Sequence, residues 1–422
     1  MLMSQIGYLG VGAERRYQLA NWAADHAINA GVIEAATSGT LTSGAEYEYG
    51  VTMAGDYRLI HGTGTHGNAR VVKIAVVPIP GSVWGGMNTL GGTVNLGGNS
   101  AIAGCDDEDT SDCLSTAINS FGNITVTADE STIADCSSNP SGVEGNPPVQ
   151  QREPRDDLAS LYFNAEDSDD MVSVVGDLFN VDPGNLVFDP QLATDSPCRY
   201  DGTENCTTTS SNNISCGDDF DITTGPGGCN NVFIAQAPLT INDHIANNAD
   251  VNIVSGDTVT IEGNNNTMGS ATVNNRLNIF ADTLLVNPGA QTEVHGGVFY
   301  SNNQATINFN NNTDLGTAAN PMLLIAQGNG LTFGGSGNGD FYGMIYADAD
   351  NVSSTGQGNW TLHGSVVSNS AIDVDVTGNL SVRLNMDVLQ NLAGNLPSGL
   401  MQQPRCGVEN NNFLTNTKST LY

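Results

Sequence analysis

The chain has 422 residues, of which 39% are hydrophobic, so it is long enough to bury a substantial core. Asp and Glu outnumber Lys and Arg by 45 to 12, which gives a formal net charge of −33 at pH 7. A field of that sign repels nucleic acid, whose binding requires neutralised phosphates, so the composition argues against a nucleic-acid partner.

The first thirteen residues, MLMSQIGYLGVGA, are apolar and uncharged. They are too few to span a bilayer, and they lack the basic start and small-residue cleavage site of a signal peptide. The following segment has helical spacing that places Leu19, Ala23 and Ala27 on one face beside Trp22. We expect one continuous helix of about 35 residues, with Leu19, Trp22, Ala23 and Ala27 as its assembly residues.

Three segments with strand alternation follow a turn-rich break at residues 39–44: AEYEYGVTMAG, DYRLIHGTG and ARVVKIAVVPIP. Tyr47 and Tyr49 alternate in the first, and Val71 and Lys73 in the third. This pattern predicts a small antiparallel sheet with one face on the helix. Residues 1–80 are therefore expected to form one α+β module.

The stretch from Asn252 to Asn385 contains short apolar segments separated by Gly and Asn turns, with no helical pattern between them. Asn residues recur at these turns, where stacked amides can form hydrogen-bonded ladders. The pattern favours a β-solenoid over residues 230–390, with a first coil at 81–104. The alternative is a sandwich, because the repeat is not fixed in length.

Seven of the eight cysteines lie between Cys105 and Cys229, without CxxC pairs or zinc-site histidine spacing. Their even number indicates disulfides and an oxidising compartment. Sequence proximity suggests the pairs Cys105–Cys113, Cys198–Cys206 and Cys216–Cys229, which leaves Cys136 and Cys406, although 105 pairings are open. We expect residues 105–229 to be a disulfide-rich insertion or an elaborated edge of the solenoid, with helical segments at 148–163 and 168–180, and residues 391–422 to be a tail.

Two segments carry a resemblance to a known family. Residues 5–31 resemble the amino-terminal region of PilX-type large minor pilins of type IV pilus systems, in which a hydrophobic helix passes into E-x-R-x-Y-x-x-A-x-x-A-A-E-x-A. The blocks GDFYGMIYADAD and LHGSVVSNSAIDVDVTGN resemble the carboxy-terminal domain of the same proteins, with its FxGxIY and GSVV pattern. The matching positions of the first segment are Glu14, Arg15, Arg16, Tyr17, Ala20, Ala23, Ala24, Asp25 and Ala27, with Asp25 where Glu is usual.

This resemblance implies a non-enzymatic subunit that docks by its helix in a pilus, at the tip or in a priming complex. The implied partners are other minor and major pilins, a PilY-type tip adhesin and a surface glycan. The family's processing site and hydrophobic N-terminus are absent from the sequence. We therefore expect a further part of the helix upstream of Met1, which would anchor the chain in the inner membrane before it reaches the extracellular pilus.

The tightest acidic cluster is CDDEDTSDC, with Asp106, Asp107, Asp109 and Asp112 inside a nine-residue loop that the Cys105–Cys113 pair would close. Carboxylates on a short tethered loop suit Ca²⁺. The alternative is a solvated acidic loop. No other cofactor is expected.

The six histidines are scattered and form no HExxH or HxH motif, so the sequence points to no catalytic residue. Paired carboxylates have little diagnostic value among 45 acids. A secreted, polysaccharide-active β-helix enzyme remains the alternative function, but such an enzyme needs Asp together with Arg or Lys on one face. Only Arg276 and Arg383 lie within the expected solenoid. A surface adhesin exported by another route is the third candidate.

Overall fold

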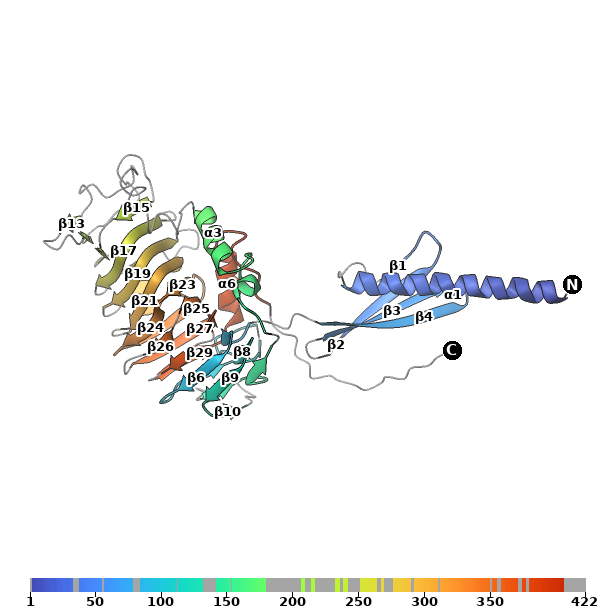
Figure 1. Cartoon of the computed structure of the whole chain (residues 1–422), viewed down its shortest axis with the longest axis horizontal. Coiled ribbons are helices and arrows are strands. Elements are labelled where there is room, and N and C mark those ends of the chain that lie inside the picture. Colours follow the sequence, from blue (N-terminus) through green and yellow to red (C-terminus); the bar gives the residue numbers. More distant parts are fainter. Residues whose placement is uncertain are drawn as a thin grey trace. The chain divides into compact units, whose positions relative to one another are not determined.

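The computed structural model describes residues 2–32, 38–54, 57–78, 84–111, 113–131, 142–152, 154–179, 206–208, 214–216, 232–235, 238–241, 251–263, 267–268, 276–289, 292–309, 312–349, 351–354, 358–370, 374–376 and 379–405. The chain divides into two compact units. The N-terminal unit comprises Met1–Ser82 together with Gly407–Tyr422, and the coiled body comprises Val83–Cys406. Figure 1 shows both units and labels many of their elements.

The N-terminal unit consists of one long helix packed on an antiparallel sheet. Helix α1 spans Leu2–Val32 and runs past the end of the sheet (Figure 1). The sheet has the order β1-β2-β3-β4. Its strands are β1 (Ser38–Thr40), β2 (Glu46–Ala54), β3 (Tyr57–His66) and β4 (Ala69–Pro78).

Small side chains bring α1 close to β3. Ala20, Ala23, Ala24 and Ala27 are fully buried on the side of α1 that faces the sheet. A Cβ at Gly64 would come within 2.0 Å of the Ala20 carbonyl oxygen, and one at Gly62 within 2.8 Å of that of Ala24. Close packing of this kind tolerates no added atoms, so the two glycines fix how near the helix lies.

The coiled body is built from parallel strands, and successive turns of the chain stack on one another. Asn338 in β25 pairs with Asn359 in β27, which pairs with Asn379 in β29. The expectation of a mainly β chain with a large parallel sheet is confirmed. The strands of this stack are β14 (Ile214–Cys216), β15 (Val232–Ala235), β16 (Leu239–Ile241), β17 (Val251–Gly263), β18 (Thr267–Met268), β19 (Leu277–Pro288), β20 (Glu293–Val294), β21 (Val298–Phe309), β22 (Asp314–Leu315), β23 (Met322–Gly328), β24 (Gly330–Gly335), β25 (Asn338–Ala349), β26 (Val352–Ser354), β27 (Asn359–Ser368), β28 (Val374–Val376) and β29 (Asn379–Arg383), and β13 (Cys206–Thr208) joins β14 antiparallel.

The coils do not stack in the order of the sequence. The first coil, made by β5 (Met87–Thr89), β6 (Gly92–Leu96) and β7 (Ala101–Ala103), pairs with the last, made by β27, β28 and β29. On its other side, the first coil pairs with strands from residues 118–151. These are β8 (Ile118–Ser120), β9 (Ile124–Thr127), β10 (Glu130–Ser131), β11 (Gly142–Glu144) and β12 (Val149–Gln151).

Of the two expectations for residues 105–229, an elaborated edge of the solenoid holds for β8–β12, which extend the stack, and a separate insertion is wrong for these strands. The physical reason is that Ile118 and Val143 are fully buried in the same apolar core as Met87 of the first coil. The expected helix at 148–163 also begins too early, because Val149–Gln151 is strand β12 and only Ala159–Tyr162 forms helix α2.

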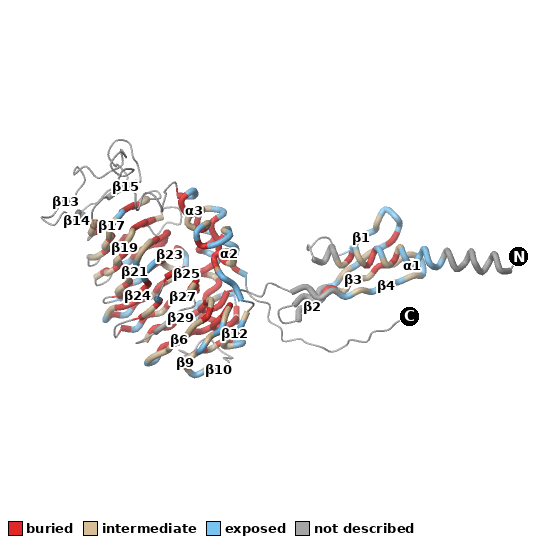
Figure 2. The backbone as a smooth tube through the Cα atoms, in the orientation of Figure 1, coloured by how far each residue is buried: buried red, intermediate tan, exposed pale blue. Residues whose placement is uncertain are grey.

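Two apolar layers stabilise the body (Figure 2). One fills the inside of the coils, with Phe299, Phe309 and Trp360 among its members. The other lies between one outer face of the coils and the helices, where Phe163 packs edge-on against Tyr346 at 5.1 Å between ring centroids. The covering helices are α2, α3 (Ser168–Phe179) and α6 (Met386–Asn395).

Amide ladders run along the coils, as the Asn-rich turns predict. Asn359 Nδ2 donates to Asn338 Oδ1 at 2.9 Å, and Asn379 Nδ2 donates to Asn359 Oδ1 at 2.5 Å. Asn278 donates in the same way to Asn252 at 3.0 Å. Each ladder satisfies side-chain amides between neighbouring turns and so fixes their register.

Candidate functional site

The two predicted sites, the assembly face of α1 and the acidic loop, lie in different units. On α1, the predicted assembly residues fall on different sides of the helix. Trp22 is 68% exposed and Leu19 is half-buried, but Ala23 and Ala27 are fully buried within the unit. The assignment of Ala23 and Ala27 to a docking face is therefore wrong, because they pack on the unit's own sheet. The exposed face of α1 is defined by Trp22 with Arg15, Gln18 and His26.

An ion pair holds the helix to the strand at the edge of the sheet. The Lys73 ammonium of β4 donates to the Asp25 carboxylate of α1 at 2.5 Å, and both side chains are partly exposed. Surface pairs of this kind contribute little free energy, so the contact orients α1 more than it stabilises the unit. Within the part of the chain that the structure describes, no helix is both long and apolar enough to cross a membrane.

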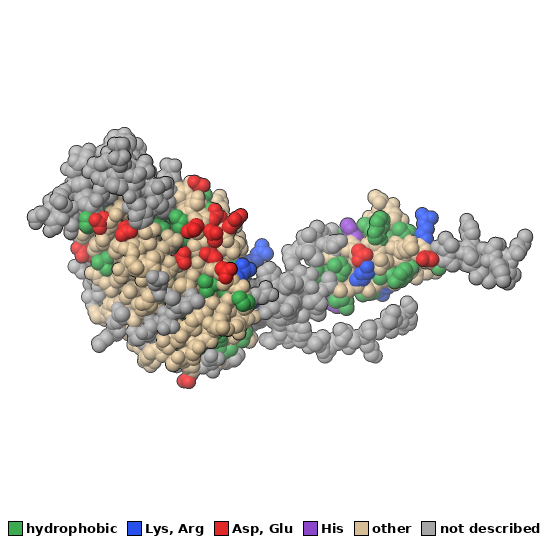
Figure 3. Space-filling model, in the orientation of Figure 1, with side chains coloured by type: hydrophobic (Ala, Val, Ile, Leu, Met, Phe, Trp, Pro, Cys, Tyr) green, Lys and Arg blue, Asp and Glu red, His purple; other side chains and the backbone are tan. Residues whose placement is uncertain are grey.

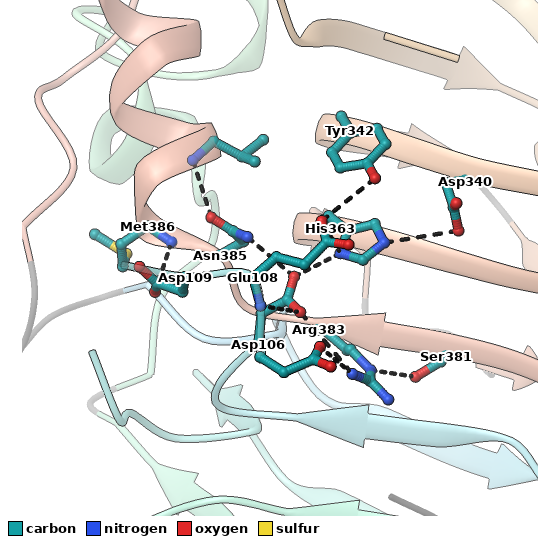
Figure 4. Close-up of polar contacts among 12 residues, drawn as sticks. Asp106, Glu108, Asp109, Asp340, Tyr342, His363, Ser381, Arg383, Asn385 and Met386 are labelled. Atoms are coloured by element: carbon teal, nitrogen blue, oxygen red, sulfur yellow. Dashed lines mark hydrogen bonds and ion pairs between the residues drawn. The ribbon is translucent and has the colours of Figure 1, made fainter. Parts of the chain in front are cut away.

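The acidic loop follows β7 and reaches across three strands of the last coils (Figure 4). Asp106 is buried, and its Oδ2 lies 2.6 Å from His363 Nδ1 in β27. Asn385, which precedes α6, donates to the same oxygen at 3.0 Å. The Asp106 carboxylate is thus bound by two residues that follow it by 257 and 279 positions in the sequence.

His363 carries a positive charge in this position. Burial by itself would lower its pKa, but the hydrogen bonds to Asp106 and Asp340 and the charges of Asp106 and Glu108 outweigh burial and raise the pKa to about 9. Burial would likewise raise the pKa of Asp106, but the contacts with His363 and Asn385 hold it below its ordinary value. The His363 ring also stacks on Tyr342, with 4.6 Å between ring centroids.

The other carboxylates of the loop bind separate groups. Asp107 Oδ1 accepts from the Arg383 guanidinium of β29 at 2.7 Å, and Glu108 Oε2 accepts from the Tyr342 hydroxyl at 3.3 Å. Asp109 Oδ2 accepts from the Met386 N–H at 3.1 Å, at the N-terminus of α6. A carboxylate there complements the helix dipole. We call Asp106, Asp107, Glu108 and Asp109 the acidic clasp, because they join the first coil to the last.

The predicted calcium site is not supported. Asp106, Asp107 and Asp109 point to His363, Arg383 and the start of α6 rather than to a common centre. Among the described residues, no group of three or more His, Cys, Asp or Glu side chains is arranged to hold a metal. Asp112 lies outside the described residues. The carboxylates diverge because protein donors from three elements satisfy them.

The cysteines follow the sequence expectation only in part. Cys105 is disulfide-bonded and buried, but it is not bonded to Cys113, which is buried beside Trp84 and Phe121 in the layer under the helices. The prediction of a nine-residue loop closed by a Cys105–Cys113 disulfide is therefore wrong. Cys206 and Cys216 lie opposite each other in the register of β13 and β14. The other predicted disulfide residues, Cys136, Cys198, Cys229 and Cys406, lie outside the described residues.

Sequence reasoning missed His363, Arg383 and α6 as partners of the acidic loop. Tyr342, His363 and Arg383 occupy equivalent positions in consecutive coils. The repeat of these three positions from coil to coil could have indicated that they lie side by side, but it is recognisable only once the coil length is known. For α6, the signal was Asn385, whose side chain accepts from Val388 N–H as an N-cap, followed by Asp387 in the first turn.

The surface of the body is strongly acidic. Residues 83–406 carry 38 Asp and Glu against six Lys and Arg, whereas residues 1–82 carry six against five. Figure 3 shows acidic side chains gathered over α3, where Glu166, Asp167, Asp169 and Asp177 are exposed. The net charge of the chain thus belongs almost wholly to the coiled body.

Comparison with known proteins adds no relative. No family model, no curated protein and no solved structure matches the chain.

Proposed function

We propose that this protein is a non-enzymatic, PilX-type minor pilin or pilin-like subunit, located at the cell surface in a type IV pilus. It docks by α1 at the tip or in a priming complex, and it displays the coiled body as a β-solenoid outside the filament. Its partners are other minor and major pilins, with a PilY-type tip adhesin or a surface glycan as the ligand of the body.

One observation carries this proposal: α1 is amphipathic in a way that leaves a docking face. Its alanine side packs on the sheet, while Trp22 on the exposed face is 68% exposed. A large exposed indole is unfavourable in water, and its burial against a partner would stabilise a complex by about 2 kcal/mol or more. The pilin-like helix motif indicates which partner to expect on this face, namely the helix of another subunit.

The distribution of charge fits the same arrangement. The N-terminal unit has nearly balanced charges in residues 1–82, so copies of it can pack together. The bodies, each with a large excess of acidic residues, repel one another and nucleic acid. These charges therefore favour an arrangement in which copies of the protein contact each other through the N-terminal unit and keep their coiled bodies apart.

The enzyme alternative has less support from the geometry. Asp106 and Glu108, the carboxylates beside the charged His363, already accept hydrogen bonds from protein donors. Asp314 and Asp340 are the more exposed acids nearby, and burial raises the pKa of Asp314. The cationic group beside these two acids is His363, whose Nε2 lies 3.6 Å from Asp340 Oδ1, but its Nδ1 is already bound by the buried Asp106.

The test is incorporation of a Trp22→Asp variant into filaments. An acid on the docking face should abolish recovery of the protein in sheared filaments, because an unpaired charge would be buried at the contact. Leu178→Asp is the matched control, since Leu178 is an exposed apolar residue of the body, 37% exposed. Normal incorporation of Trp22→Asp, or equal loss with both variants, would contradict the proposal.

A further inference from the structure

Three carboxylates form a column along one face of the coiled body. Glu293 in β20 is aligned with Asp314 in β22. Asp314 in turn lies beside Asp340 in β25, whose N–H donates to Asp314 Oδ1 at 3.2 Å. Neighbouring strands lie about 4.7–4.9 Å apart, so the acids follow one another along the stack at that spacing. All three are at least partly exposed, and we call them the acidic column.

The middle of the acidic column has no cation to balance it. Burial and the charges of Asp340 and Glu293 raise the pKa of Asp314, although a backbone hydrogen bond and the charge of His363 act against them. Two residues after Asp314 the chain has Gly316, which has no side chain to offer. Among the described residues, no Lys or Arg forms an ion pair with any of the three acids. The column therefore carries an excess of negative charge.

A buried histidine faces each end of the acidic column. His295 is 6% exposed, and its Nε2 lies 3.7 Å from Glu293 Oε2. Burial lowers its pKa, and its Nδ1 has no hydrogen-bond partner in the described structure. His363 is 5% exposed, and its Nε2 lies 3.6 Å from Asp340 Oδ1, which is too far for a hydrogen bond. Unsatisfied buried nitrogens on both imidazoles beside unbalanced carboxylates are the state expected of a site whose ligand is absent.

The surroundings of the acidic column indicate the class of ligand. Among the described residues, no three acids or histidines are arranged around a metal ion, so the column suits separate ammonium groups in a line. Asn338 lies two positions before Asp340 on the same face of β25, and it is exposed together with its ladder partner Asn359. Exposed amides suit hydroxyl groups. An extended glycan of amino sugars carries hydroxyl and ammonium groups at a repeat close to the strand spacing.

We propose that the acidic column binds the ammonium groups of an extended amino-sugar glycan, which runs along the stack with its hydroxyl groups on the Asn338–Asn359 ladder. The inference rests on one part of the proposed function, the surface glycan as ligand of the body, and it names the class of that glycan. It does not rest on the docking of α1. An anionic glycan would be repelled by the acidic body.

Calorimetric titration of the full-length protein with a β-linked glucosamine tetramer, in a buffer that protonates its amines, tests the proposal. Asp314→Asn keeps an acceptor for the Asp340 N–H but removes the central charge, so the Kd should rise by about tenfold or more. Asp177→Asn is the matched control, because it removes one exposed acid of α3 away from the column. It should leave the Kd unchanged. Incorporation of Asp314→Asn into filaments should be normal.

Four results would overturn the proposal. Absence of binding would mean that the column is not a site for this glycan. Equal weakening by both substitutions would mean that only the overall charge of the body attracts the tetramer. Equal affinity for the N-acetylated tetramer would mean that ammonium groups are not recognised, and equal affinity for tetralysine would indicate a basic peptide instead. Because Trp22→Asp tests filament docking separately, the two proposals can fail independently.

Discussion

The two units hold their strands together by different means. In the N-terminal unit, the backbone of α1 approaches Gly62 and Gly64 directly, and the described contacts of the helix and sheet lie within residues 2–78. In the coiled body, the first and last coils meet across more than 250 residues of sequence, and the acidic clasp joins them. The helix–sheet contact of the first unit depends on the absence of side-chain atoms, whereas the junction of the first and last coils adds charged groups to an apolar core.

This difference follows from topology. A helix on a short meander needs only local contacts, which cost little loop-closure entropy. When the first coil of a stack pairs with the last, the entropy of closing a long loop is lost before any contact between the two coils forms. Ion pairs at the junction, such as Asp106 with His363, favour that closure over a stack that ends open.

The largest effect should come from Gly64. In Gly64→Val the new Cβ would lie 2.0 Å from the Ala20 carbonyl oxygen, so α1 must move off the sheet. We expect a loss of about 4 kcal/mol or more from the N-terminal unit, with the melting of the coiled body unchanged. Calorimetry on the full chain would measure both transitions.

Gly50→Ala is the control for that substitution. Gly50 lies in β2, and a Cβ there would meet nothing within 4 Å. A large loss of stability in Gly50→Ala would mean that strand glycines of this sheet matter for a reason other than the approach of α1.

Removal of His363 should affect the other unit. His363→Gln leaves the buried Asp106 carboxylate without its cationic partner, and we expect a loss of about 3–5 kcal/mol from the coiled body. The N-terminal unit should be unaffected. A double-mutant cycle with Asp106→Asn checks the pairing, because the second substitution should recover part of the loss. Strict additivity of the two would rule out direct coupling.

The stability of the body should depend on pH in two directions. The pKa of His363 is raised from 6.5 to about 9, so its contribution is complete below pH 6.5 and is lost as pH rises through about 9. The pKa of Asp106 is held below 3.8, so its contribution is present above that pH and is lost as pH falls through the lowered value. Denaturant midpoints between pH 3 and pH 10 should show this profile, and His363→Gln should abolish the alkaline limb.

The smallest effect should come from the amide ladder. Asn359→Ala breaks one hydrogen bond to Asn338 and one from Asn379 in an exposed part of the coils, and we expect a loss of about 1 kcal/mol. Denaturant titration of the coiled body would measure it. A loss as large as that of His363→Gln would mean that coil stacking depends on the ladder more than on the clasp.

The sequence by itself determined the local elements of both units. The spacing of Leu19, Ala23 and Ala27 predicts a helix, and alternation in residues 46–78 predicts its sheet, because both periodicities reflect burial of one face. The Gly and Asn turns likewise predict a mainly β body. These features are local, so a pattern of a few residues is enough to find them.

Only the tertiary structure decided how the distant parts meet. It placed Ala23 on the sheet and left Trp22 exposed, although the sequence pattern predicts both as assembly residues. It also placed the acidic loop on His363 and Arg383 instead of around a metal. These outcomes depend on which coil lies beside which, and that order is fixed by the sum of contacts over the whole core. No sequence window contains both Asp106 and His363, so no local pattern could pair them.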